Sequence, residues 1–239
     1  LWVLRLRGGY RLFFEKTTEE IVTQVLTDAG IPAAALQPRL AGSYPVRLQC
    51  AQYDESEWDF VARLLAEEGI SCWFDTSEQG EHRVYFGDGL GSHDGIEGGA
   101  TLPYAGPLGA LRPEARAFSS LAWEEQVVVD RVMLRDFDIR NPDVYIEGAS
   151  GEGELEHFIY PGFVPSSEAA KGRAERRLEQ LKREQVSVRG ETDCIRVKAG
   201  RVLELSGGGA EIFEQKMLIS AVTHRYERPL RRIFEGGDA

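Results

Sequence analysis

Histidines are among the side chains that most often hold metals or move protons, and this chain has four: His82, His93, His157 and His224. A zinc site needs ligands at short, regular spacing, such as two histidines one helical turn apart or two cysteines two residues apart. None of the four histidines has such a neighbour or a cysteine close by. We therefore interpret them as surface or strand residues and predict no metal ligands.

A second possible cation site is the acidic run from Asp136 to Asp138, with Glu147 downstream. Carboxylates at alternate positions are typical of calcium-binding loops. Here, however, Arg140 occupies a ligand position, and Asn141 stands where such a loop needs a glycine for its sharp turn. We predict no calcium site.

Residues 87–91, Gly-Asp-Gly-Leu-Gly, partly match a dinucleotide-binding turn. That turn requires a third glycine at a fixed spacing and opens directly into a helix, and the sequence provides neither. The Gly-x-Ser-x-Gly elbow of serine hydrolases is also absent from the sequence. We interpret 87–91 as part of a flexible connector and predict no cofactor and no cofactor-binding residues.

Two pairs of adjacent carboxylates, Glu19-Glu20 and Glu67-Glu68, fall at the start and the end of predicted helices. Adjacent residues on a helix do not face each other. Neither pair therefore resembles a general acid and base couple, and we interpret both as solvent-exposed. With no catalytic residue predicted, we expect no enzymatic activity.

Basic side chains concentrate on one predicted helix, residues 166–184. They are Lys171, Arg173, Arg176, Arg177, Lys182 and Arg183. Glutamates alternate with them, and Glu179 and Arg183 have the spacing that favours an ion pair. The pattern predicts an exposed face with many salt bridges; docking onto an acidic neighbouring subunit is the alternative.

Composition argues against several classes of protein. The chain of 239 residues has 28 Lys and Arg against 39 Asp and Glu, a formal charge of −11. Such an excess of acidic groups opposes binding to nucleic acids or anionic membranes, which depends on clustered basic residues. The cysteines Cys50, Cys72 and Cys194 are widely spaced, which indicates reduced structural thiols. No apolar run approaches the length that spans a bilayer.

The first half reads as strands and helices in a mixed sheet. Residues 1–7 alternate in character, which predicts a strand already under way at the first residue, and we expect the chain to begin inside a domain. A capping box at 17–20 predicts a helix that ends near Gly30. Ser56 is the expected N-cap of a second helix ending at Gly69, preceded by a strand at 46–53 and followed by strands at 70–74 and 83–86, with a turn at 79–81.

Residues 87–113 are rich in glycine and proline, and predict a connection between two subdomains. The second half is rich in predicted strands. These are residues 127–137, 155–160, 186–189, 201–205 and 217–226. One long helix interrupts them, with an apolar stripe made of Ala170, Ala174, Leu178 and Leu181. Several short strands with one helix are typical of a small barrel.

Particular stretches of the sequence resemble one protein family. Residues 47–70, with Trp73 and Phe74 after them, closely match the signature of VgrG spike proteins of type VI secretion, in which a Gln-Tyr-x-Glu-Ser turn leads into a helix ending Glu-Glu-Gly-Ile. Further blocks follow in the family's order: 18–22 with 25–26 and 30–31, 102–104, 134–138 with 141–142, 160–162, 174–178, 190–194 and 200–206. The resemblance covers nearly the whole chain.

The resemblance implies an α+β fold similar to a phage tail hub, with a small α/β subdomain and a β-barrel tube domain that includes one long helix. It implies a homotrimer in which two barrels per subunit form a pseudo-hexameric ring on a hexameric secretion tube protein. Other implied partners are baseplate and spike-tip proteins and effector cargo, with no nucleic acid and no stable membrane insertion. Assembly would take place in the cytoplasm, followed by contractile ejection into a target cell.

Set against this family, the chain is expected to be a hub fragment. Residues 1–15 would be the terminal strand(s) of a truncated first tube barrel, 16–117 the α/β subdomain and connector, and 118–235 the second barrel. The remaining barrel, the oligosaccharide-binding-fold domain and the needle would lie outside it, with Ala239 marking the truncation. Two alternatives stay open: a phage tail hub or late-control protein, and a cell-wall hydrolase module.

Overall fold

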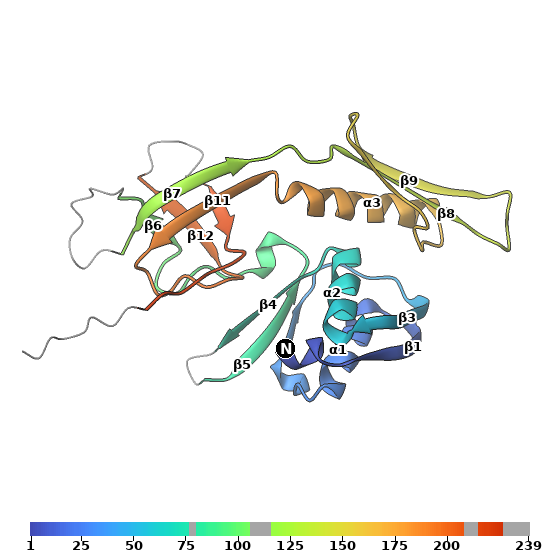
Figure 1. Ribbon diagram of the computed structural model, residues 1–239, viewed down its shortest axis with the longest axis horizontal. Coiled ribbons are helices and arrows are strands. Elements are labelled where there is room, and N and C mark those ends of the chain that lie inside the picture. The colour runs from blue at the N-terminus through green and yellow to red at the C-terminus, as the bar shows by residue number, and fades with distance from the viewer. Residues whose placement is uncertain (77–79, 106–115, 208–214, 227–239) are drawn as a thin grey trace, which may run out of the picture.

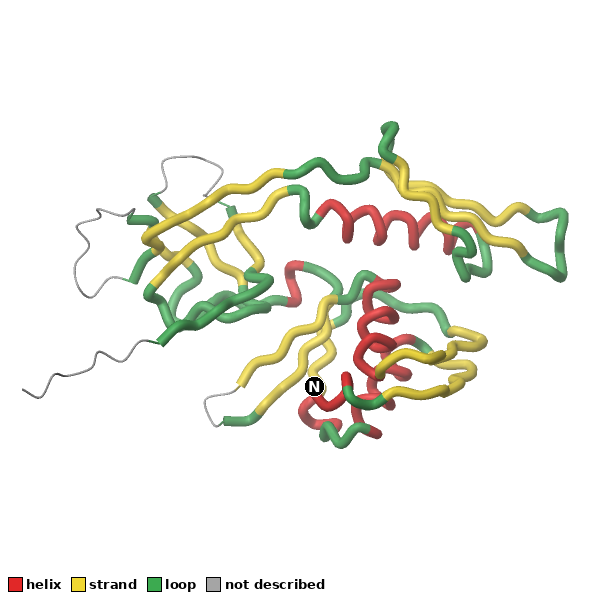
Figure 2. Tube along the Cα trace, viewed as in Figure 1, coloured by secondary structure: helices red, strands yellow, loops and turns green. Residues whose placement is uncertain are grey.

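The computed structural model describes residues 1–76, 80–105, 116–207 and 215–226. Its elements gather in three groups, each with a hydrophobic core of its own (Figure 1). Helices and strands are both well represented in each half of the chain (Figure 2), which agrees with the predicted α+β class.

The first group contains residues up to Gly87. Its elements are η1 (Trp2–Arg5), β1 (Gly8–Lys16), α1 (Thr18–Asp28), η2 (Ala33–Ala35), β2 (Leu36–Arg39), β3 (Arg47–Ser56), α2 (Glu57–Glu68), β4 (Ser71–Thr76) and β5 (His82–Gly87). Strands β1 and β3 form an antiparallel pair, and β2, β5 and β4 form a second sheet in that order. The strand β2 is an addition to the prediction, and part of the predicted turn at 79–81 lies outside the described residues.

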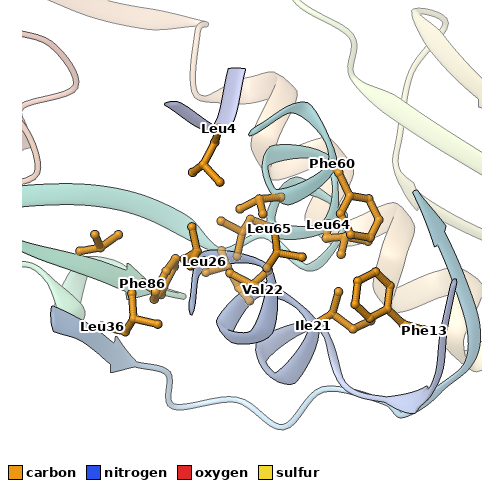
Figure 3. Packing of buried hydrophobic residues seen from close by; sticks show 14 of the residues in the cluster. Leu4, Phe13, Ile21, Val22, Leu26, Leu36, Phe60, Leu64, Leu65 and Phe86 are labelled. Carbon is orange, nitrogen blue, oxygen red and sulfur yellow. The ribbon is translucent and has the colours of Figure 1, made fainter. Parts of the chain in front are cut away.

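The core of this group lies around α1 and α2 (Figure 3). Phe60 of α2 is fully buried and stacks on Phe13 of β1, with ring centroids 5.6 Å apart. Strands β2 and β5 contribute Leu36 and Phe86 from the other side. Each such side chain stabilises the fold by about 1.5–3 kcal/mol when buried, so this core holds both sheets to the two helices.

Both predicted helix starts are confirmed. The hydroxyl of Thr17 accepts a hydrogen bond from the amide of Glu20, and the Glu20 carboxylate accepts one from the amide of Thr17, which completes the capping box. The hydroxyl of Ser56 accepts from the amide of Asp59 in the same manner. Gly69 ends α2 in the left-handed conformation, at φ 71°, where a side chain would be strained.

The start of the chain differs from its prediction. Residues Trp2–Arg5 form a turn of 3-10 helix and not a strand, because Leu4 turns inward and is buried in the first core. Strand β1 pairs with β3 and places Phe13 in that same core. The pairing thus places residues 8–16 beside the α/β group. The domain limits expected from the sequence, 1–15, 16–117 and 118–235, stay predictions.

The second half supplies the other two groups. Its elements are η3 (Leu90–Ser92), β6 (Thr101–Pro103), β7 (Phe118–Glu125), β8 (Arg131–Phe137), β9 (Tyr145–Gly151), β10 (Glu156–Ile159), α3 (Ser167–Lys182), β11 (Val186–Thr192), β12 (Val202–Ser206) and β13 (Lys216–Leu218). Strands β7 and β9 are additions to the prediction, and of the strand predicted at 217–226 only the start is extended in a sheet.

These strands form three sheets, β11-β7, β13-β12-β6 and β10-β8-β9, and no single closed barrel is present among the described residues. Strand β6 comes from the predicted connector and pairs in parallel with β12. The β8–β10 sheet and α3 lie between β7 and β11 in the chain, so they form an insertion with its own core. Residues 106–113 of the connector and 208–214 and 227–235 of the predicted barrel lie outside the described residues.

Helix α3 packs directly against β8 and β9. The predicted stripe of Ala170, Ala174 and Leu178 is buried there, with Leu181 partly buried beside it. The small alanines allow close approach: a Cβ added to Gly148 of β9 would come within 2.2 Å of the Lys171 amide nitrogen and 2.5 Å of the Ala170 carbonyl carbon. No helix of the described ranges is long and apolar enough to cross a membrane.

We expect Gly148→Val to destabilise the chain by about 3 kcal/mol or more, because the added atoms collide with the backbone of α3 and not with a flexible side chain. The matched control is Gly172→Ala, on α3 itself, where a Cβ meets only the guanidinium of Arg176 at 3.5 Å. That change should stabilise by about 0.5–1 kcal/mol through helix propensity. Urea unfolding measures both; equal effects would contradict the close contact.

Candidate functional site

Two clusters of charged side chains connect the three groups, and the first lies where α2 ends against α3. This α2–α3 charge cluster contains Glu67 and Glu68, with Arg47 of β3, Arg63 of α2 and Arg173 and Arg176 of α3. The two carboxylates are adjacent in sequence and lie at the last turn of α2. Their position brings three elements to one place.

Glu67 accepts from three arginines. Its Oε2 lies 2.7 Å from Arg47 Nη1, and its Oε1 lies 3.3 Å from Arg63 Nη1 and 3.2 Å from Arg173 Nη2. Arg173 also donates to the carbonyl of Gly162 at 2.8 Å. One guanidinium therefore binds the carboxylate of Glu67 in α2 and, at the same time, the backbone of its own insertion.

Glu68 is more deeply buried, with only 5 % of its surface exposed. Its Oε1 lies 2.7 Å from Arg47 Nη2, and its Oε2 lies 3.3 Å from Arg176 Nη2. Thr18, at the start of α1, donates its hydroxyl to the same carboxylate at 3.4 Å. Arg47 thus binds both glutamates with its two terminal nitrogens, the forked geometry that makes arginine pairs strong and directional.

The prediction that Glu67 and Glu68 are solvent-exposed is wrong. Glu68 is buried and Glu67 is partly buried, because Arg173 and Arg176, which the sequence placed on an exposed face of α3, turn toward α2 and bind them. The first pair, Glu19-Glu20, matches its prediction more closely, since both side chains are exposed. Arg183 is exposed, as expected, but it pairs with Glu184 at 3.4 Å and not with Glu179, the partner that the spacing favoured.

Burial alone would disfavour the charged form of Glu67. The positive charges of Arg173 and Arg47 outweigh it, and the pKa of Glu67 lies below its ordinary value. The same balance lowers the pKa of Asp75, where burial is opposed by hydrogen bonds from Arg201 and Lys198. Both carboxylates are therefore ionised at neutral pH.

The second cluster, the β4 anchor, consists of Trp73 and Asp75 of β4 with His93, Lys198 and Arg201. Asp75 pairs with Arg201 and, at 3.0 Å, with Lys198. Lys198 and Arg201 both lie in the loop that precedes β12. The cluster therefore ties the β2-β5-β4 sheet to the group that contains β12.

Aromatic packing reinforces the β4 anchor. The rings of Trp73 and His93 lie 4.0 Å apart, and His93 Nδ1 lies 2.9 Å from the carbonyl of Gly200. Because a carbonyl only accepts, Nδ1 is the protonated nitrogen of this histidine. Gly200 has φ 81°, and a Cβ there would lie 2.3 Å from the Trp73 ring, so the position requires glycine.

The other candidate residues have structural partners. His82 Nδ1 lies 3.0 Å from the hydroxyl of Thr76. His157 lies in strand β10. Asp136 accepts from the amide of Val164 at 2.8 Å, and Asp138 caps its own turn by accepting from the amide of Arg140. In the described ranges no three histidine, cysteine or acidic side chains come together as a metal site.

Residues 87–91 do not open into a helix of useful length, since η3 spans only Leu90–Ser92. Asp88 instead accepts from the amides of Ala41 and Gly42, at 2.8 and 2.7 Å, and from the hydroxyl of Tyr44. Burial raises the pKa of the Cys72 thiol to about 12, so this cysteine is protonated and a poor nucleophile at neutral pH.

Both clusters connect structural groups to one another. A family model described as phage tail baseplate hub (GPD) matches residues 1–230. The chain belongs to this family. This match confirms the resemblance to a phage tail hub that the sequence indicated.

Curated relatives of this hub chain are spike proteins of Pseudomonas aeruginosa. The type VI secretion system spike protein VgrG5 is 30% identical over 95% of the chain, and VgrG1a is 28% identical over 99% of it. These matches take in 29% and 37% of the two relatives. The hub chain therefore spans about a third of the length of the curated proteins that it matches.

Solved structures show the same fold. An Escherichia coli component of the type VI secretion system, described as similar to the T4 phage tail proteins gp27 and gp5, superposes with a TM-score of 0.64 at 18% identity, over 91% of this chain and 46% of its own. A 43 kDa tail protein of prophage MuSo2 from Shewanella oneidensis gives 0.58 at 12% identity, over 90% and 65%. The tail-hub-like fold is confirmed.

We expect Glu68→Ala to destabilise the hub chain by about 2–4 kcal/mol, because it leaves Arg176 and one terminal nitrogen of Arg47 without a carboxylate in a largely buried place, while Arg47 keeps its pair with Glu67. The control is Glu184→Ala, which removes an exposed partner of Arg183 and should change stability by less than about 1 kcal/mol. Thermal unfolding followed by circular dichroism compares the two. A neutral Glu68→Ala would contradict the role of the cluster.

Acid should loosen the connections between groups. Glu67 and Asp75 have folded-state pKa values below those of the unfolded chain, so their contribution is complete above the unfolded values, near 4.5 and 3.8. It is lost as pH falls through those values toward the lowered ones. Unfolding free energies measured from pH 6 down to pH 3 should fall less steeply for Glu67→Gln than for the unaltered chain, and parallel slopes would refute this assignment.

Proposed function

We propose that the chain is part of the structural hub at the spike tip of a bacterial type VI secretion machine, where it adapts a hexameric tube to a three-fold spike. The observation that carries this proposal is the extent of the similarity. Matches to type VI spike proteins run through 95–99% of the chain, and the fold agrees over 91% of it with a type VI component. All three structural groups are therefore included.

The internal connections support a mechanical role. Each group has its own core, and the α2–α3 charge cluster and the β4 anchor hold the groups at fixed positions. A part that is pushed into a target cell must transmit force without rearranging, and ion pairs that are buried and forked resist sliding better than a flat apolar contact does. We infer a non-enzymatic role for this chain.

The proposed partners follow from symmetry. Three copies that each contribute two similar barrels match a ring of six, and heterologous contacts close such a ring. We propose a homotrimer that binds the hexameric tube protein, baseplate and spike-tip proteins, with effector cargo carried on the spike. Assembly in the cytoplasm and ejection through the machine complete the proposal.

A phage tail hub is the second candidate. It is favoured by the fold shared with the prophage MuSo2 tail protein, whose sequence identity is too low to indicate more than the fold. The curated relatives favour the secretion role. Purification of the chain with phage tails from induced cells would reverse this preference.

In the organism that encodes the chain, we expect Arg173→Ala combined with Arg176→Ala in the full-length protein to abolish release of the tube protein into the medium, because the insertion is no longer held to α2. Arg183→Ala combined with Arg189→Ala removes two exposed pairs and should leave release intact. Immunoblots of medium and cells measure both. Undiminished release after deletion of the whole gene would contradict the proposed function.

A further inference from the structure

Both ring nitrogens of His93 have partners, and these partners belong to different structural groups. Nδ1 lies 2.9 Å from the carbonyl oxygen of Gly200, in the loop that precedes β12. Nε2 lies 3.3 Å from the hydroxyl oxygen of Ser71, the first residue of β4. The imidazole of His93 therefore spans the two groups that the β4 anchor connects.

The hydroxyl of Ser71 has a second partner. It lies 2.8 Å from the carbonyl oxygen of Gly87, the last residue of β5, and donates to it. The result is a chain of three contacts that runs from Gly200 through His93 and Ser71 to Gly87. Both ends of this chain are carbonyl oxygens, which only accept hydrogen bonds. All the hydrogens must therefore come from the imidazole and the hydroxyl.

The number of hydrogens separates the two charge states of His93. A neutral imidazole has one N–H and a serine has one O–H, which leaves one of the three contacts without a hydrogen. Ser71 then donates either to Nε2 or to Gly87, and never to both. An imidazolium has two N–H groups, so all three contacts are complete. Gly87 and Gly200 are buried, where an unpaired carbonyl costs more than it does in water.

Aromatic packing keeps the imidazole in this position. The rings of Trp73 and His93 lie 4.0 Å apart with their planes inclined by 31°, and Trp73 in turn stacks on Tyr85 at 5.5 Å. The face of an indole attracts positive charge. The stack therefore favours the imidazolium in the same direction as the hydrogen bonds do.

The charged side chains around His93 are balanced. They are three carboxylates and three cations that pair with one another: Asp75, Asp94 and Glu97 with Arg39, Lys198 and Arg201. Carboxylates and basic groups of these types keep their charges between pH 8 and pH 5.5. Their summed charge thus favours neither state of the imidazole, and the hydrogen bonds and the indole decide between the two.

We propose that His93 is a pH-operated clasp, which holds the β2-β5-β4 sheet more firmly to the group of β12 when its imidazole gains a proton. The proton completes a hydrogen bond in the folded chain and none in the unfolded chain, so protonation favours folding. This stabilisation is complete below about pH 6.5, where histidines of the unfolded chain become charged, and it is lost as the pH rises. The clasp does not depend on the hub function.

Urea unfolding of the 239-residue chain at pH 8 and pH 5.5 tests the clasp. The comparison is with His93→Asn, whose amide nitrogen replaces Nδ1 as a donor to Gly200 but takes no proton. Between the two pH values, we expect the folding equilibrium constant of the unaltered chain to rise about two- to tenfold more than that of the variant, the factor that one hydrogen bond gives. The lost ring stack weakens the variant at both pH values alike. An equal rise in both chains would refute the clasp.

Ser71→Ala separates hydrogen bonding from charge, because serine does not titrate in this range. The variant leaves Nε2–H without its acceptor, so at least half of the rise between pH 8 and pH 5.5 should disappear. The matched control is Thr76→Ala, which removes the hydroxyl 3.0 Å from Nδ1 of His82 and should leave the rise unchanged. An undiminished rise in Ser71→Ala would assign the effect to the surrounding carboxylates and overturn the proposal.

Nitrogen-15 spectra of the histidine rings in the unaltered chain provide a test that needs no variant to fold. We expect His93 to carry its hydrogen on Nδ1 at pH 8 and a hydrogen on each nitrogen at pH 5.5. The hydrogen on Nδ1 should exchange slowly with water at both pH values, since Gly200 accepts it. A ring that carries its single hydrogen on Nε2 at pH 8, or one that stays neutral at pH 5.5, rules the clasp out.

Discussion

The last turn of α2 carries the constraint on which the rest of the structure depends: two adjacent carboxylates must lie among arginines from three elements. Removing Glu67 and Glu68 from water is costly unless each oxygen receives a donor, and Arg47, Arg173 and Arg176 meet this condition only when β3, α2 and α3 stand at one relative position. Charge pairing therefore fixes the placement of the insertion as well as stabilising it.

This dependence follows from how small the separate cores are. The core of the insertion includes two alanines among its six buried residues, Val132, Leu134, Ile146, Ala170, Ala174 and Leu178. Alanines bury little apolar surface, and surface burial is what stabilises a small domain. The insertion therefore needs contact with α2 to be well ordered. The β4 anchor holds the group of β12 in the same way: Trp73 lies against Gly200, and Asp75 binds Arg201.

Short sequence patterns predict the helix ends correctly. The burial of charged side chains depends on contacts between residues that are distant in the chain, and these patterns do not report it. Thr17, Ser56 and Gly69 marked helix ends correctly because capping depends on residues within one turn. The run at Trp2–Arg5 was read as a strand because alternation over so few residues also fits a 3-10 turn. The burial of Glu67 and Glu68 depends on Arg173 and Arg176, more than 100 residues away in the chain, and no periodicity reports that. One signal was available: Arg173 is three residues from Ala170, so it shares a face with the buried stripe.

Acidity and exposed apolar surface have to be reconciled in a chain of this kind. A charge of −11 keeps copies apart by mutual repulsion, which protects a protein whose sheets have open edges and uncovered apolar side chains. The same repulsion would oppose every encounter between copies unless it were relieved at particular places. Six basic side chains bind the carboxylates of the two clusters: Arg47, Arg63, Arg173, Arg176, Lys198 and Arg201. Others stay at the surface in several places: Arg5 stacks on Trp2, Arg183 pairs with Glu184 and Arg189 pairs with Glu124. Specific association then depends on where the outward-facing cations lie, and not on the amount of apolar surface alone.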